Sequence, residues 1–171
     1  MAGLICVAAS CAILLLTQRV LLFCALAAFA SLFDALDGAV ARAGGRATKS
    51  GAYLDAVCDR YAETLIILSV ARVTGYWLLS GLVLAGALLV SYAKARAAME
   101  VAVSNLEWPD LMERPERMVV YVIGLAASRL TAWAPLGRDL FWWTLAALAV
   151  LVHATAIRRI RRAMRLIRAR A

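Results

Sequence analysis

Acidic residues are scarce in this sequence. Of its 171 residues only 11 are aspartate or glutamate, and charged residues of both signs together make up 18%. Hydrophobic residues make up 64%, and the mean hydropathy is +0.80. Because roughly half of the residues in a soluble domain are apolar, this composition excludes an ordinary soluble domain of this length. It predicts one integral membrane domain.

Histidine and cysteine are also sparse. The one histidine, His153, lies late in the last apolar run, and we expect it to be a structural or interfacial residue without a catalytic role. The four cysteines (Cys6, Cys11, Cys24 and Cys58) show neither disulfide nor zinc-ribbon spacing, so we expect reduced packing residues. No basic stretch precedes the first apolar run and no Ala-x-Ala exit follows it, so we do not expect a cleaved signal peptide.

Charged residues divide the chain into long apolar runs. These runs occupy residues 2–16, 20–41, 51–73, 76–93, 118–133 and 140–157. Because backbone groups in lipid must satisfy their own hydrogen bonds, each run is expected to be helical. The sequence therefore predicts an all-α bundle of six transmembrane helices over residues 1–157. A basic amphipathic tail with seven arginines follows over residues 158–171, and we expect it to lie on anionic lipid.

The basic residues are unevenly distributed. A net charge of +8 would suggest nucleic acid as the partner of a soluble protein, but here the charges lie at the ends of apolar runs. We therefore expect membrane lipids as partners, and no nucleic acid. Fourteen of the 19 lysines and arginines fall on the side that holds residues 42–50, residues 94–117 and the tail. By the positive-inside rule, that side and both termini face the cytoplasm of a multi-pass plasma-membrane protein.

Four of the six aspartates fall within 26 residues, where the second apolar run meets the third. On helices, Asp34 and Asp37 are i and i+3, and Asp55 and Asp59 are i and i+4, so each pair projects from one face. Because the two helices meet on one side of the membrane, all four carboxylates can converge. Together they repel unless neutralised, and Mg²⁺ and Mn²⁺ prefer oxygen ligands. We therefore predict a site for two divalent ions, as in phosphoryl transfer from a diphosphate.

Two neighbouring residues suit the same chemistry. Gly38 in a helix interior is about 1 kcal/mol less favourable than alanine, and its missing side chain would let a bulky ligand approach the backbone. Arg42 lies one turn further along the same face and is suited to bidentate phosphate contact. Helix–helix packing is the commoner reason for a membrane glycine, but the four nearby aspartates favour a ligand.

These residues match a known family without a departure. The pattern resembles the signature of the CDP-alcohol phosphatidyltransferases, and in this sequence it reads Asp34-x2-Asp37-Gly38-x2-Ala41-Arg42-x8-Gly51-x3-Asp55-x3-Asp59. The resemblance implies a six-helix membrane enzyme, with its active site at the cytoplasmic end, that moves a phosphatidyl or archaetidyl group from a CDP-linked lipid to an alcohol and releases CMP. It also implies a homodimer.

The resemblance assigns a role to each motif position. Asp34, Asp37, Asp55 and Asp59 would ligate two Mg²⁺ or Mn²⁺ ions, and Asp59 would also be the general base for the acceptor hydroxyl. The CDP-binding residues would be Asp34, Gly38, Ala41, Arg42, Gly51 and Asp55. Family members carry an amphipathic segment ahead of the first helix, whereas this sequence begins within that helix, so we expect a minimal version or a missing segment.

A second stretch bears on the acceptor, which the motif does not encode. The sequences Ser91-Tyr92-Ala93-Lys94-Ala95-Arg96-Ala97 and Glu113-Arg114-Pro115-Glu116-Arg117 are similar to stretches in prokaryotic phosphatidylinositol-phosphate and archaetidylinositol-phosphate synthases. The resemblance implies inositol phosphate as the acceptor, held by Lys94, Arg114 and Arg117. The structural alternative is that these are positive-inside charges, with Glu113 and Glu116 as their ion-pair partners.

Other functions remain open at this point. Family members that use glycerol phosphate share parts of the second stretch. A variant that joins inositol phosphate to CDP-inositol is a further alternative. A cation-coupled membrane transporter is an alternative from a different class, since intramembrane acids mark function either way. A catalytically silent scaffold is a third, against which the intact motif argues.

Overall fold

The computed structural model describes residues 2–43, 48–101 and 112–170, with the side chains of residues 2, 34–43 and 170 outside the description. These residues form helices and contain no strand. The α-helices are α1 (Ala2–Thr17), α2 (Val20–Ala43), α3 (Lys49–Thr74), α4 (Trp77–Glu100), α5 (Arg114–Leu130) and α6 (Leu140–Arg170), and one short 3-10 helix, η2 (Pro135–Gly137), precedes α6. The predicted all-α class with six helices is confirmed.

Three helices extend beyond the predicted apolar runs. Helix α4 continues to Glu100, α5 begins at Arg114, and α6 continues through the predicted tail to Arg170. Hydropathy marks only the part of a helix that suits lipid, whereas alanine, arginine and glutamate continue a helix well in water. In the extension of α4, Arg96 Nη2 lies 2.6 Å from Glu100 Oε1, which is the i,i+4 pairing that stabilises an exposed turn.

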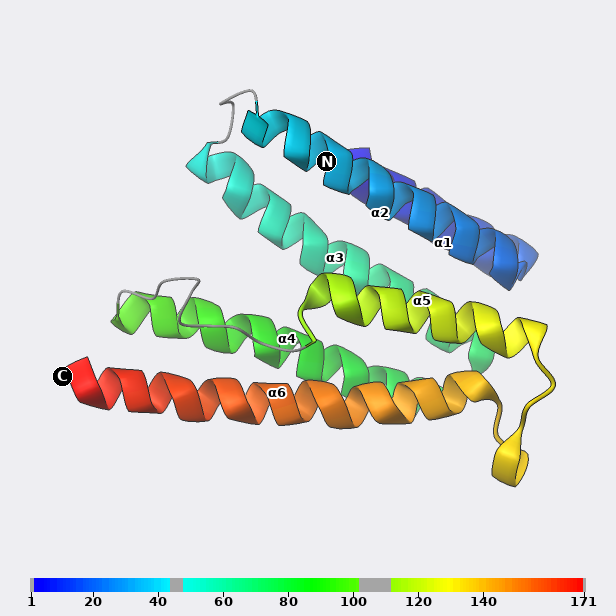
Figure 1. Cartoon of the computed structure of the whole chain (residues 1–171). Helices are drawn as coiled ribbons and strands as arrows, with labels where there is room; N and C mark the ends of the chain where they lie inside the picture. The colour runs from blue at the N-terminus through cyan, green and yellow to red at the C-terminus, as the bar shows by residue number, and fades with distance from the viewer. Residues whose placement is uncertain (1, 44–47, 102–111, 171) are drawn as a thin grey trace.

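The six helices pack so that the predicted functional segments share one side of the bundle. Helix α1 packs against α2 and α3, α4 packs against α3 and α6, and α5 packs against α2 and α6. In Figure 1 the C-terminal ends of α2, α4 and α6 point to the same side as the N-terminal ends of α3 and α5. This arrangement brings the motif on α2 and α3 to the side that also holds Lys94 and Arg114.

Two glycines allow α6 to lie close to its neighbours. A Cβ atom built on Gly86 of α4 would lie 2.3 Å from Val152 Cγ2, and one built on Gly124 of α5 would lie 2.4 Å from Thr144 Cγ2. Both distances are too short for real carbon atoms, and the β-branched side chains on α6 have little rotamer freedom to move away. Small residues at helix contacts are typical of membrane bundles.

Large apolar side chains also cover much of the outer surface. Leu16, Leu78 and Ile123 are among many that are exposed, whereas Leu14, Phe23 and Ile67 are fully buried. Two described helices, α4 and the Leu140–Ala169 part of α6, are long and apolar enough to cross a membrane by length and composition. Shorter apolar helical segments are Gly3–Thr17 and Val20–Phe33.

The close contact at Gly86 gives a stability prediction. We expect Gly86→Val to lower the free energy of unfolding by about 1–3 kcal/mol, because the added carbons overpack the contact with Val152. Gly81→Val is the matched control on the same helix, since a Cβ at Gly81 meets nothing within 4 Å. Thermal unfolding of both variants in detergent measures the difference. Equal midpoints for the two variants would contradict the close contact between α4 and α6.

Candidate active site

The N-cap of α3 fixes where the helix that carries Asp55 and Asp59 begins. Thr48 is the N-cap, with extended backbone at φ −111° and ψ 154°, and its Oγ1 accepts a hydrogen bond of 3.0 Å from the backbone N–H of Gly51. A Cβ at Gly51 would lie 3.0 Å from the same Oγ1, so a side chain at position 51 would crowd the hydroxyl that caps the helix. The capped helix then carries Asp55 and Asp59 one turn apart on one face.

The first half of the motif is described only as backbone. Asp34, Asp37, Gly38, Ala41 and Arg42 belong to the last turns of α2, and their side chains lie outside the described residues. On α3, Asp55 is exposed and Asp59 is partly buried. Among the side chains that the structure describes, no three metal-ligating groups lie together. The convergence of four carboxylates therefore stays a prediction.

Asp59 lies against a predicted acceptor residue. Its Oδ1 is 2.6 Å from Nη1 of Arg114, the first residue of α5, and each side chain keeps about a quarter of its surface exposed. This contact joins two stretches that sequence analysis treated separately, the aspartate motif and the Glu-Arg-Pro-Glu-Arg stretch. It also places a guanidinium beside the predicted general base.

A buried carboxylate lies one turn further along α3. Glu63 is 1% exposed, and its two oxygens bind two different guanidiniums. Oε1 accepts a hydrogen bond of 2.7 Å from Arg117 Nε, and Oε2 accepts one of 3.0 Å from Arg60 Nη1. Arg60 Nη1 also donates to Ser91 Oγ at 2.7 Å. Because an unpaired carboxylate is strongly disfavoured in such a site, these contacts tie α4 and α5 to α3.

The glutamates of the second stretch have other partners than expected. Glu116 Oε2 accepts a hydrogen bond of 2.7 Å from the backbone N–H of Met112, and Glu113 Oε1 lies 3.1 Å from Arg159 Nη2. The expected pairing of Glu113 and Glu116 with Arg114 and Arg117 is therefore wrong for the described contacts, whereas a positive-inside role for Lys94, Arg114 and Arg117 stays a prediction. Neighbouring charges were expected to pair locally, but the first turn of α5 lies within reach of α3, where Arg114 and Arg117 contact Asp59 and Glu63.

Arg159 is not a lipid-facing residue of the tail. It is 4% exposed, and its Nη1 donates a hydrogen bond of 2.8 Å to the backbone carbonyl of Val90. Arg159 follows the buried residues Val152 and Ala156 at helical spacing, so it continues the face of α6 that packs against α4. That spacing was the signal that could have separated Arg159 from the other arginines.

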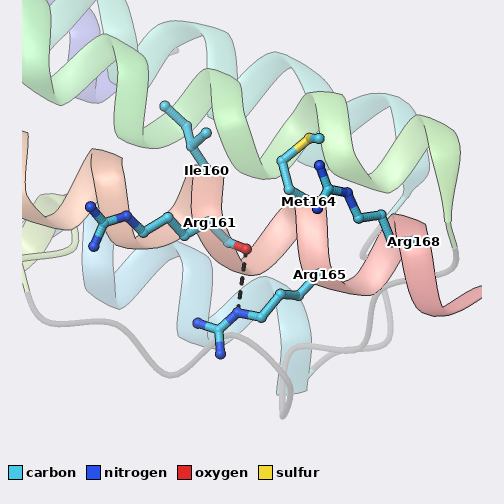
Figure 2. Close-up of a pocket in the computed structure, with 5 residues that line it drawn as sticks. All are labelled: Ile160, Arg161, Met164, Arg165 and Arg168. Atoms are coloured by element: carbon cyan, nitrogen blue, oxygen red, sulfur yellow. Dashed lines mark hydrogen bonds between the residues drawn. The ribbon is translucent and has the colours of Figure 1, made fainter.

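Further basic residues lie on α4 and along α6. Lys94 is partly buried on α4, one turn after Ser91. A surface depression of about 370 Å³ lies along the end of α6, lined by Ile160, Arg161, Met164, Arg165 and Arg168 (Figure 2). No aspartate lines it. The exposed arginines of this depression match the predicted basic tail, but α6 continues into it as one helix.

Sequence reasoning missed Glu63, Ser91 and Thr48 as contributors to this region. Thr48 could have been found as a threonine ahead of a helix start. Glu63 could have been found because it continues the row of Asp55 and Asp59 at i+4 spacing. The role of Ser91 depends on the packing of α4 against α3, which no local pattern encodes.

Comparison with known proteins adds independent support. A sequence model of the family described as CDP-alcohol phosphatidyltransferase matches residues 1–153. The chain is 34% identical over 127 residues to the phosphatidylinositol phosphate synthase of Corynebacterium glutamicum, covering 67% of this chain and 54% of the relative. It is 34% identical over 119 residues to the archaetidylinositol phosphate synthase of Pyrococcus horikoshii, covering 68% and 62%. The chain thus spans less than two thirds of the length of these curated relatives.

Solved structures agree on the fold. The crystal structure of Mycobacterium tuberculosis phosphatidylinositol phosphate synthase with CDP-DAG bound superposes with a TM-score of 0.79 at 27% identity, covering 95% of this chain and 82% of that one. The structure of the same synthase with manganese and citrate gives 0.80 at 26% identity, covering 95% and 79%. With the family match over nearly the whole sequence, the chain belongs to the CDP-alcohol phosphatidyltransferase family, whose members are integral to the membrane.

Proposed function

We propose that this protein transfers a phosphatidyl or archaetidyl group from a CDP-linked lipid to an alcohol and releases CMP. The observation that carries the proposal is the complete family motif at the α2–α3 junction, with Asp59 in contact with Arg114. The curated relatives are named as synthases of inositol phosphate lipids, and one structural neighbour was solved with CDP-DAG bound. A transporter would require neither this motif nor a basic residue beside Asp59.

The donor atoms suit a hard divalent cation. Asp55 and Asp59 offer carboxylate oxygens on one face of α3, accessible from outside the bundle, and Asp34 and Asp37 belong to the last turns of the helix that precedes the loop to α3. Mg²⁺ and Mn²⁺ prefer such oxygen ligands. We propose that these four residues hold two ions, which would neutralise the diphosphate of the donor. A structural neighbour was solved with manganese.

Asp59 is the proposed base. It would take the proton of the acceptor hydroxyl while the hydroxyl oxygen forms a bond to the lipid-linked phosphorus of the donor. The bond from that phosphorus to the bridging oxygen would break, and CMP would leave with the bridging oxygen. The Arg114 guanidinium next to Asp59 would hold an anionic group of the substrate in line with this transfer.

The remaining motif residues are proposed to bind the CDP portion of the donor. Gly38, Ala41 and Gly51 lack large side chains and would let the nucleotide approach the backbone, and Arg42 would contact phosphate. Asp34 and Asp55 would contribute to the same subsite beside the metal ions. The small size of Gly51 also serves the Thr48 cap, so its substitution would disturb both the helix start and the subsite.

For the acceptor we propose inositol phosphate, bound in a basic pocket of Lys94, Arg114 and Arg117. Arg114 and Lys94 are partly exposed and would contact the phosphate directly, with the buried Arg117 behind them. The names of the relatives support inositol phosphate. Glycerol phosphate is the alternative acceptor, because a phosphate on a small alcohol suits the same cations.

We also propose a multi-pass arrangement in the plasma membrane, as a homodimer, with the motif and both termini on the cytoplasmic side. The uneven distribution of lysine and arginine supports this orientation. The end of α6, residues 158–170, would then stand beyond the hydrocarbon core, where Arg161, Arg165 and Arg168 can contact anionic headgroups.

Metal dependence tests the reaction class. We expect the purified protein to release CMP from CDP-diacylglycerol with inositol phosphate when Mg²⁺ or Mn²⁺ is present, and to stop when EDTA removes the metal. Chromatography of the nucleotide products measures the release. If no metal and no common alcohol, phosphorylated or not, gives CMP, the enzyme function is wrong.

The role of Asp59 gives a second prediction. Asp59→Asn should lower kcat by about 100-fold or more, because asparagine cannot accept the hydroxyl proton. Asp139→Asn is the matched control: the Asp139 carboxylate accepts a hydrogen bond from the N–H of Trp142 at the start of α6, and asparagine caps equally well. Near-normal CMP release by Asp59→Asn would contradict its role as base.

An acceptor panel tests the substrate. Inositol phosphate, glycerol phosphate, inositol and serine are each added to the enzyme with CDP-diacylglycerol and metal, and the lipid products are separated. We expect turnover with inositol phosphate and far less with inositol, because the basic pocket needs a phosphate. Turnover with glycerol phosphate but not inositol phosphate would contradict the proposed acceptor.

A further inference from the structure

Glu63 is a buried acid that the proposed reaction does not use. It lies one turn after Asp59 and two turns after Asp55 in the same row of α3, yet only 1% of its surface is exposed. A carboxylate at such depth requires cationic partners, and it has two of them, Arg117 and Arg60. The row on α3 therefore runs from the exposed Asp55, through the partly exposed ion pair of Asp59, to the buried ion pair of Glu63.

Arg117 is fixed from several directions. Its Nε and Nη2 lie 2.7 Å and 2.6 Å from Glu63 Oε1, and its Nη1 donates a hydrogen bond of 2.8 Å to the backbone carbonyl of Met112. Met112 has a left-handed backbone at φ 66°, which a non-glycine residue rarely adopts, and Glu116 accepts a hydrogen bond from its N–H. The chain entering α5 is thus held in one conformation by the first turns of the helix itself, anchored to Glu63.

Arg114 lies one turn before Arg117 on α5 and makes the outer contact. Two ion pairs, Glu63 with Arg117 and Asp59 with Arg114, connect α3 and α5 one helical turn apart. The side chains of the first pair are buried, and each side chain of the second pair is about a quarter exposed. Arg114 Nε is buried and has no hydrogen-bond partner among the described residues, so the exposed part of this guanidinium is the part that faces outward.

We propose that Glu63 is a positioning residue for acceptor binding. Through Arg117 it holds the first turn of α5, so that Arg114 presents its guanidinium beside Asp59 to the phosphate of the acceptor. This inference rests on the proposed function, and it assigns a role in the reaction to a residue outside the family motif. Because the described partners of Glu63, Arg117 and Arg60, include none of the proposed CDP-binding residues, we expect Glu63 to influence the acceptor more than the CDP-linked lipid.

The test separates the two substrates of the reaction. Initial rates of CMP release are measured over a grid of CDP-diacylglycerol and the phosphorylated acceptor that the wild-type enzyme uses, with metal in excess. We expect Glu63→Gln to raise the acceptor KM by about tenfold or more, because an amide has one neutral acceptor oxygen where the carboxylate has two charged ones, and so it holds the Arg117 guanidinium more weakly. The donor KM should stay unchanged. Glu63→Asp keeps the charge and should fall between the wild type and Glu63→Gln.

Glu100→Gln is the matched control, since it removes an exposed acid of α4 that pairs with Arg96, and it should leave both KM values unchanged. A merely structural role for Glu63 would reduce the folded fraction and lower the rate without raising the acceptor KM selectively. That result, or an equal rise in both KM values, overturns the inference.

The second variant decides the outcome where the first does not fold. If Glu63→Gln is not obtained as folded protein, Glu63→Asp carries the test, and a wild-type acceptor KM or an equal change for both substrates overturns the inference. An absence of CMP release by the wild-type enzyme with every acceptor instead overturns the proposed function, and the inference with it.

Discussion

The relative positions of α3, α4 and α5 near the proposed site depend on one buried carboxylate. Glu63 binds Arg117 of α5 with one oxygen and Arg60 of its own helix with the other, and Arg60 continues to Ser91 of α4. Removing one partner of a buried ion pair is destabilising by about 3–5 kcal/mol, because the remaining charge is left in an apolar site. The three helices are therefore held in one relative position one turn beyond Asp59, the second aspartate of α3.

The first turn of α5 is the centre of this arrangement. Its residues contact α3 through Arg114 and Arg117, and the residue that caps it, Glu113, contacts Arg159 of α6. These contacts reach from a partly exposed ion pair at Asp59 to a fully buried one at Glu63. The proposed metal ligands on α3 and the proposed acceptor cation Arg114 are in this way parts of one connected structure.

Much of this architecture could be predicted from the sequence, for physical reasons. Long apolar runs separated by charges determine helices in lipid, and the fixed spacing of Asp55 and Asp59 determines a shared helical face. The full lengths of α4 and α6 could not be predicted from hydropathy, since their ends are polar but still helical. The partners of Arg114, Arg117 and Arg159 could not be predicted either, because they lie on helices distant in the sequence.

The proposed reaction requires the carboxylates of the α2–α3 junction to form a centre for two divalent ions. Titration of Mn²⁺ into the purified protein, followed by electron paramagnetic resonance, tests for this centre, since bound and free Mn²⁺ give different signals. We expect two bound ions per chain in the wild type and fewer in Asp55→Asn, with Glu100→Gln unchanged. Equal Mn²⁺ binding by the wild type and Asp55→Asn would contradict it.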